Sequence, residues 1–171
     1  MRKLALAITA LLLICSCGEP EPIEPPTSEA PSDAAPTMPT EAAETTPEGQ
    51  VEFVRHVVST LNYAVNSGSF DALEPLFDPA CEACATYVSK VRKDNAGKGR
   101  IAGFRWRVAK GEVLDGGIVE ASIDASGYRK ADPETGEITK VEPASYRLGF
   151  KLRSRHNQWR VEELFVPSAK Q

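Results

Sequence analysis

Residues 51–65, with the sequence VEFVRHVVSTLNYAV, carry the clearest pattern in the chain. Their apolar side chains recur at the three-and-four spacing that places them on one face of a helix. The spacing predicts a helix that begins near Pro47 and ends near Asn66, where Gly68 can adopt the left-handed conformation of a C-cap. His56 is expected on the opposite, polar face of this helix.

Two shorter helices are expected directly after this one. Residues 71–74, Asp-Ala-Leu-Glu, form a capping box that predicts the first of them. Asp78 is a good N-cap and Pro79 suits the first helical position, so a third helix is expected to begin here and to end near Asn95.

From Gly99 onward the period of the apolar residues changes from 3.6 to 2, which is typical of strands with one exposed face. Turn sequences separate four such segments, residues 104–108, 119–125, 146–153 and 159–166. We therefore expect an α+β domain over residues 47–167, with three N-terminal helices packed on the apolar face of a four-stranded antiparallel sheet.

The segment before the domain, residues 17–46, has a different composition. Residues 18–50 contain eight prolines and eight acidic residues but no lysine or arginine. Ile23 and Met38 are its sizeable apolar side chains, so it is not expected to build a core. This composition predicts a disordered, extended stalk.

The chain begins with the features of an export signal. Arg2 and Lys3 precede an apolar run at residues 4–14, which is about half the length needed to span a membrane. The small residue Ser16 before Cys17 resembles the bacterial lipobox. We therefore predict a lipoprotein signal peptide at residues 1–16 and a lipid on Cys17 that holds the protein on the extracytoplasmic face of the cell membrane. The alternative is an ordinary cleaved signal followed by free secretion.

Charge argues against nucleic acid as a partner. The formal net charge of the chain is −4, but the acidic residues of the stalk account for it. The predicted domain is nearly neutral and lacks the basic excess that nucleic-acid binding requires. On the strands, acidic residues alternate with the basic ones, and we expect a solvated face of cross-strand pairs. These basic residues are Arg105, Arg107, Arg147, Lys151, Arg153 and Arg160.

Several segments together resemble an uncharacterised family of actinobacterial lipoproteins over about residues 46–167. The segments are the first helix, Gly68 with residues 70–73, residues 79–84, residues 103–106 and residues 159–161. The resemblance implies the cone fold of nuclear transport factor two-like and SnoaL-like proteins, in which a curved sheet wraps a long helix and leaves a cavity. Candidate lining residues of that cavity are Tyr63, Tyr87, Phe104, Trp106, Tyr146, Phe150 and Trp159.

Cys81 and Cys84 form a Cys-x-x-Cys motif. In an exported protein the default interpretation of such a pair is a structural disulfide. A redox role is the alternative, because a cysteine at a helix N-terminus has a lowered thiol pKa. A zinc site is not expected, since the chain has no second cysteine pair and His56 and His156 lie in different elements.

No motif in the chain indicates catalysis. General acid–base chemistry needs a titratable group in the cavity, and no phosphate-binding loop, nucleophile elbow or close carboxylate pair is present in the sequence. We expect a non-catalytic accessory module without a cofactor, whose partner is an envelope protein or a small apolar ligand. The alternative is a SnoaL-like enzyme that acts on a small apolar substrate.

Overall fold

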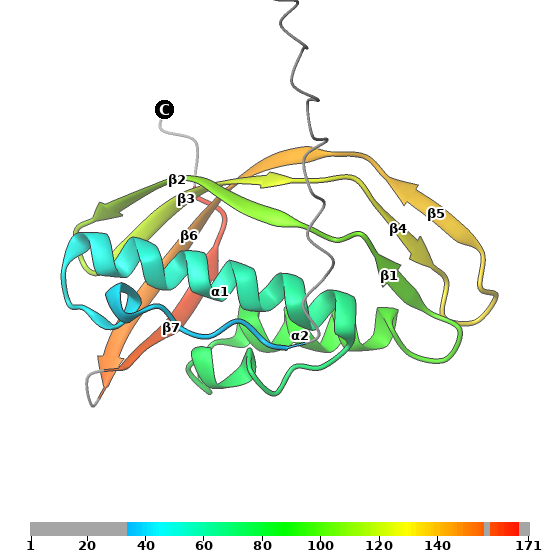
Figure 1. Ribbon diagram of the computed structural model, residues 1–171, viewed down its shortest axis with the longest axis horizontal. Helices are drawn as coiled ribbons and strands as arrows, with labels where there is room; N and C mark the ends of the chain where they lie inside the picture. The colour runs from blue at the N-terminus through cyan, green and yellow to red at the C-terminus, as the bar shows by residue number, and fades with distance from the viewer. Residues whose placement is uncertain (1–33, 156–157, 168–171) are drawn as a thin grey trace, which may run out of the picture. The chain divides into compact units, whose positions relative to one another are not determined.

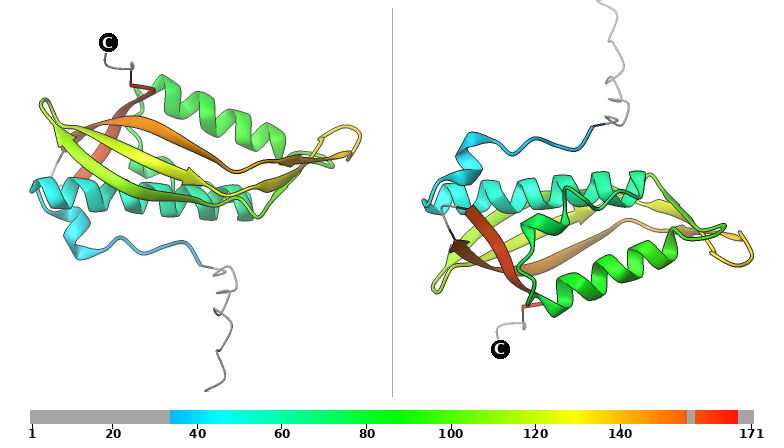
Figure 2. Two further views of the ribbon diagram at one scale, coloured as in Figure 1. Left: turned by 90° about the horizontal axis from the view of Figure 1, so that it is seen from above. Right: turned by 90° about the horizontal axis from the view of Figure 1, so that it is seen from below.

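The structure, a computed structural model, describes residues 34–155 and 158–167. It contains the α-helices α1 (Pro47–Ser67) and α2 (Glu82–Asp94) and the 3-10 helices η1 (Thr40–Ala43) and η2 (Glu74–Leu76). The strands are β1 (Arg100–Ala102), β2 (Trp106–Leu114), β3 (Ile118–Ala125), β4 (Tyr128–Ala131), β5 (Ile138–Val141), β6 (Ala144–Arg155) and β7 (Gln158–Phe165). Both α-helices lie on the same side of the strands (Figure 1, Figure 2).

The strands form two antiparallel sheets that continue one another. The larger sheet has the order β2-β3-β6-β7 and the smaller one β1-β4-β5. The pairing of β3 with β6 reaches Ala125 and Ala144, and β4 and β5 resume it at Tyr128 and Val141. The two sheets therefore follow one curved surface over the helices (Figure 1).

The sheets separate where the residues cannot continue a regular ladder. Pro143, between β5 and β6, has no N–H to donate to a neighbouring strand. Gly127, between β3 and β4, lies so close that a Cβ atom there would be 3.2 Å from Cδ of Pro143. Gly103, between β1 and β2, has a φ of 79°, which a residue with a side chain rarely adopts. Gly103, Gly127 and Pro143 thus each interrupt one of the three strands that would otherwise run from one sheet into the other.

The expected plan of three helices on one four-stranded sheet is wrong. In the described part of the chain there are two α-helices and two antiparallel sheets, of four and three strands. The capping box at residues 71–74 leads into a turn and the 3-10 helix η2. Pro75 lies in this segment, and its missing N–H prevents an α-helical hydrogen-bond ladder from forming there.

The smaller sheet was missed because its strands are short and lack alternation. They contain three or four residues each, and β4 places Arg129 next to Lys130. The predicted third helix also begins later than expected, at Glu82 instead of Pro79. Asp78 forms a turn before it, in which Oδ1 of Asp78 accepts a hydrogen bond from the backbone N–H of Ala80 at 3.0 Å.

Helix α1 is buried on more than its predicted apolar face. His56 is 7% exposed and Thr60 is 1% exposed, so the expectation that His56 lies on a polar face is wrong. The physical reason is that α1 has packing partners on more than one side: η1 and strands of both sheets contact it, and Ala42 is fully buried in the core. The strands cover another side of the helix (Figure 2).

Residues 34–46 are the last part of the predicted stalk, and in the structure they contact the folded domain. Nε1 of Trp159 donates a hydrogen bond to the backbone oxygen of Glu44 at 2.9 Å. Gly49 allows the close approach, because a Cβ atom at this position would lie 2.4 Å from the same oxygen.

The predicted signal peptide, Cys17 and the rest of the stalk lie outside the described residues. Among the described residues, no helix is long and apolar enough to cross a membrane.

Candidate binding site between the helices and the sheet

A cavity of about 140 Å³ lies between the two α-helices and the larger sheet. Its walls are apolar side chains, together with the ring of one tyrosine and one half of the disulfide. They are Val57, Val58, Leu61, Phe77, Cys84, Tyr87, Trp106, Leu148, Phe150, Val161 and Leu164. The volume is close to that of an engineered apolar cavity of about 150 Å³ that stays dry and binds benzene. The cavity therefore has room for an apolar group of about one ring.

The structure brings some of the predicted lining residues together and separates others. Tyr87, Trp106 and Phe150 line the cavity. Phe104 and Tyr146 contact Trp106 beside it, with ring centroids 5.4 Å and 5.7 Å away. Two residues lie elsewhere: Tyr63 is half-buried on α1, and Trp159 binds Glu44.

Two lining residues, Tyr87 and Trp106, belong to an aromatic cluster that extends beyond the cavity. We call four of its members the aromatic rim: Tyr87, Trp106, Tyr128 and Tyr146. The ring centroid of Tyr87 is 6.1 Å from that of Trp106. Tyr128 contacts this cluster through Phe104, and the ring centroids of Tyr128 and Phe104 are 5.4 Å apart in an edge-to-face arrangement. The rim thus combines side chains from α2, β2, β4 and β6.

The inner face of the sheet is open at the aromatic rim. Tyr146 is paired across the strands with Ile123, which is fully buried, so both side chains lie on the inner face. Tyr146 is nevertheless 44% exposed. Tyr128 lies on the same inner side, because Lys130, two residues further along β4, forms an ion pair with Asp94 of α2. The rim is therefore accessible from solvent.

Two asparagines of α1 hold the backbone that carries Trp106. Oδ1 of Asn62 accepts from the N–H of Trp106, and Nδ2 of Asn62 donates to its carbonyl oxygen, both at 2.8 Å. One turn later, Asn66 accepts from the N–H of Phe104 at 3.1 Å and donates to its oxygen at 2.7 Å. Strand β2 is at the edge of its sheet, so these contacts satisfy backbone groups that no strand pairs.

A third asparagine makes the same kind of contact from α2. Asn95, the C-cap of that helix, accepts from the N–H of Ile101 at 2.9 Å and donates to the oxygen of Val65 at 3.2 Å. Sequence reasoning assigned Asn66 and Asn95 to helix ends and gave Asn62 no role. The sequence did contain a signal for this role, because the spacing of Asn62 and Asn66 places two side-chain amides one helical turn apart beside the apolar face of the helix.

Among the described residues, no charged side chain lines the cavity. Burial raises the pKa of the Tyr87 hydroxyl, and Tyr128, Tyr146 and Asp94 nearby raise that pKa further. Burial also raises the pKa of Asp94, but hydrogen bonds from Lys90 and Lys130 outweigh it and leave that pKa below its ordinary value. Asp94 is thus a carboxylate held between two lysines, at 2.7 Å and 2.9 Å.

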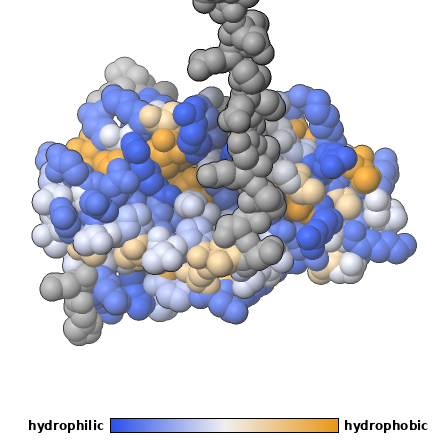
Figure 3. All heavy atoms as spheres, viewed as in Figure 1, coloured by the Kyte–Doolittle hydropathy of each residue, from blue (hydrophilic) through white to orange (hydrophobic). Residues whose placement is uncertain are grey.

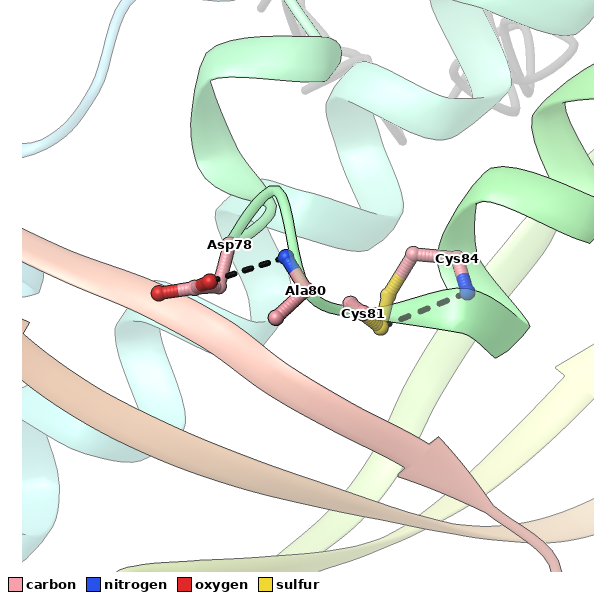
Figure 4. The surroundings of a disulfide bond; sticks show 4 residues. All are labelled: Asp78, Ala80, Cys81 and Cys84. Atoms are coloured by element: carbon pink, nitrogen blue, oxygen red, sulfur yellow. Dashed lines mark hydrogen bonds between the residues drawn. A yellow bond between two sulfur atoms is a disulfide. The ribbon is translucent and has the colours of Figure 1, made fainter.

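The cysteine pair lies at the beginning of α2 (Figure 4). A disulfide joins Cys81 and Cys84, and Sγ of Cys81 accepts a hydrogen bond from the backbone N–H of Cys84 at 3.3 Å. The two residues are 2% and 1% exposed, so solvent has little access to the bond. Elsewhere in the described ranges, 34–155 and 158–167, no cluster of His, Cys, Asp and Glu side chains is arranged to hold a metal ion.

The outer face of the larger sheet carries paired charges. Arg107 binds Asp124 at 2.8 Å, Arg147 binds Glu120, and Arg153 and Lys151 both bind Glu162. These cross-strand pairs cancel much of the positive field.

In the view of Figure 3 the surface is largely hydrophilic, and hydrophobic residues form separate patches within it. Neither observation indicates a docking surface on these faces.

The sequence of the chain matches the model of a protein family. The model of a family of unknown function, DUF6318, matches residues 23–163. None of the curated proteins matches the chain.

Nine chains of solved structures are similar to parts of this chain, among them the following three. One is an NTF2-like protein of unknown function from Shewanella baltica, with 11% identity, a TM-score of 0.46, and coverage of 75% of this chain and 100% of that one. Another is the intermembrane space region of the chloroplast protein ARC6, with 12% identity, a TM-score of 0.45, and coverage of 68% and 95%. The third is an uncharacterised protein with a cystatin-like fold from Caulobacter vibrioides, with 10% identity, a TM-score of 0.45, and coverage of 70% and 91%.

Proposed function

The chain belongs to the family of unknown function DUF6318, and on that premise we propose that it is a non-catalytic binding module for a small apolar ligand. The proposal includes a lipid anchor at Cys17 that holds the module outside the cell, on the membrane surface. The ligand site is the cavity between α1, α2 and the sheet.

The chemistry of the cavity walls is the observation that supports binding. Acid–base catalysis works best with a group whose pKa lies near the operating pH. Tyr87 is the ionisable side chain among the described lining residues, and its pKa is raised far from neutrality. His56 is not a lining residue. These walls can exclude water and surround an apolar group, and they offer no proton carrier for the enzymatic alternative.

The anchor rests on the residues that follow the apolar run. Ser16 and Cys17 have the order that the lipobox requires, and the run before them is too short to span a membrane. A tether that begins at Cys17 would join the folded domain at about residue 34, because Ala42 and Glu44 already pack against the domain. The cavity would then stay near the membrane surface, where small apolar molecules concentrate.

Benzene tests the proposal, because it matches the volume of the cavity. Titrating benzene into the protein should raise the thermal midpoint and shift the NMR signals of the lining residues. Leu148→Phe places a larger, aromatic side chain in the cavity wall and should weaken both effects. Val113→Phe is the matched control, since it introduces the same side chain on β2 outside the lining and should leave benzene binding intact. Absence of binding to the unmodified protein, or equal binding to Leu148→Phe, would contradict the proposal.

A further inference from the structure

The aromatic rim carries polar groups that nothing in the folded part uses. The hydroxyls of Tyr87, Tyr128 and Tyr146 come from three different elements. Within the described residues, none of the three makes a hydrogen bond to a protein group. They nevertheless lie close enough for Tyr128 and Tyr146 to influence the ionisation of Tyr87. Three hydroxyls without a protein partner thus belong to one aromatic cluster beside the cavity.

The aromatic rim is continuous with the cavity. Tyr87 and Trp106 belong to both, because their rings line the cavity and also contact the rest of the aromatic cluster. A ligand whose body fills the cavity would therefore present its other end to the rim hydroxyls. The site has an apolar interior and a polar entrance.

The charges around the entrance determine which polar group fits. A phenol hydroxyl both donates and accepts hydrogen bonds, so three of them can match an alcohol, an amide or a carbonyl. A charged head would lose its water without gaining a counter-ion, and burying an unpaired charge is costly. Asp94, the charged residue that acts on Tyr87, is already bound by both Lys90 and Lys130 in ion pairs.

We propose that the aromatic rim binds the uncharged polar head of a small amphipathic ligand whose apolar body, about one ring in size, occupies the cavity. The proposal rests on the proposed function and adds the class of ligand: a neutral molecule with one hydroxyl, amide or carbonyl group. Asn62 and Asn66 support the site indirectly, because they fix the backbone of Trp106 and Phe104.

Four probes with the same ring test the choice of head: toluene, benzyl alcohol, benzoate and benzylammonium. Affinities are measured by NMR titration of the unmodified protein. Benzyl alcohol should bind about fivefold more tightly than toluene, the gain from one net hydrogen bond. Benzoate and benzylammonium should bind more weakly than toluene. Equal affinity for benzyl alcohol and toluene, or tighter binding of either ion, would overturn the proposal.

Variants that remove only the hydroxyls identify the groups responsible. The triple variant Tyr87→Phe, Tyr128→Phe and Tyr146→Phe retains the rings, so toluene should bind as before while the preference for benzyl alcohol disappears. Tyr63→Phe, on α1 away from the rim, should keep the preference. A preference that survives in the triple variant would overturn the inference and leave the proposed function standing. Failure of toluene itself to bind would overturn both.

Discussion

Asn62 satisfies both backbone polar groups of Trp106, accepting from its N–H and donating to its carbonyl oxygen at 2.8 Å each. This pair of bonds connects the middle of α1 to the edge strand that carries the central ring of the aromatic rim. A side-chain amide is the group that suits the position, because it contains a donor and an acceptor side by side. The contact therefore links the stability of the fold to the geometry of the site.

Replacing Asn62 by Ala should destabilise the domain by about 1–3 kcal/mol, because it leaves two partly buried backbone groups without partners. Asn62→Asp keeps the acceptor but loses the donor. Chemical denaturation measures both, and each variant should have a lower unfolding free energy than the unmodified protein. Ser59→Ala, on the same helix and exposed, is the control. Unchanged stability of Asn62→Ala would show that the two bonds contribute nothing.

Much of the fold could be predicted from local periodicity, and the rest depends on contacts between distant segments. The apolar spacing around Val57 and the Gly68 cap are sufficient to predict α1, whose C-cap has a φ of 79°. Alternation along β3, where every second side chain from Val119 to Ala125 is buried, is sufficient to predict that strand. Such patterns arise within one element, so they are visible in the sequence.

The missed features have no local pattern. The smaller sheet exists because Gly127 and Pro143 interrupt two long paired strands, and a short charged strand such as β4 looks like a loop in isolation. Residues 34–46 pack on α1 although their composition resembles an unfolded stalk, and the burial of His56 on that helix has no local pattern either. The tyrosines of the cavity were identified as aromatic residues, but only the fold separates Tyr87 from Tyr63.

Removing residues 34–45 should destabilise the domain. A chain that begins at residue 46 loses the buried Ala42 and the Glu44 oxygen that accepts from Trp159. Its thermal midpoint should fall by several degrees, since about 1 kcal/mol corresponds to roughly 4 °C in a domain of this size. A chain that begins at residue 34 is the control and should melt like the longer protein. Equal midpoints for the two truncated chains would show that the segment does not stabilise the domain.

Trp159→Phe isolates the hydrogen bond within that segment. The substitution keeps an aromatic ring but removes the N–H that donates to Glu44. It should reduce the unfolding free energy of the chain beginning at residue 34 by about 1 kcal/mol. The chain beginning at residue 46 lacks the acceptor, so the same substitution there should have a smaller effect. Equal effects in both chains would contradict the contribution of this bond.

The stability of the domain should fall as the pH drops below about 6.5, and His56 should be a cause. Burial lowers the pKa of His56 from its ordinary value of 6.5. The unfolded state therefore binds a proton at a higher pH than the folded state, and the stabilisation present above the unfolded pKa is lost as the pH falls. Unfolding free energies measured between pH 7.5 and 5 should decrease less in His56→Gln than in the unmodified protein. His156→Gln is the control, and identical slopes for all three would rule out this role of His56.

The disulfide between Cys81 and Cys84 should stabilise the start of α2 and take no part in redox catalysis. Replacing both cysteines by Ser should cost about 2 kcal/mol, because closing so short a loop removes little unfolded-state entropy. Since both residues are nearly inaccessible, native protein should resist reduction by dithiothreitol until it unfolds. Thiol titration measures this. Rapid reduction of the native protein, or a disulfide-exchange activity that Cys81→Ser abolishes, would support the redox alternative.

Cys17 should carry the lipid anchor in the mature protein. The small residue Ser16 precedes it, as signal peptidases require, whereas the bulky Ile14 precedes the neighbouring Cys15. Intact-mass analysis of protein extracted from membranes should find Cys17 at the N-terminus with diacylglycerol attached. Cys17→Ala should remove the lipid and either release the protein or block its processing, while Cys15→Ala should leave the anchor in place. A mature N-terminus at another residue, without lipid, would exclude the anchor and favour free secretion.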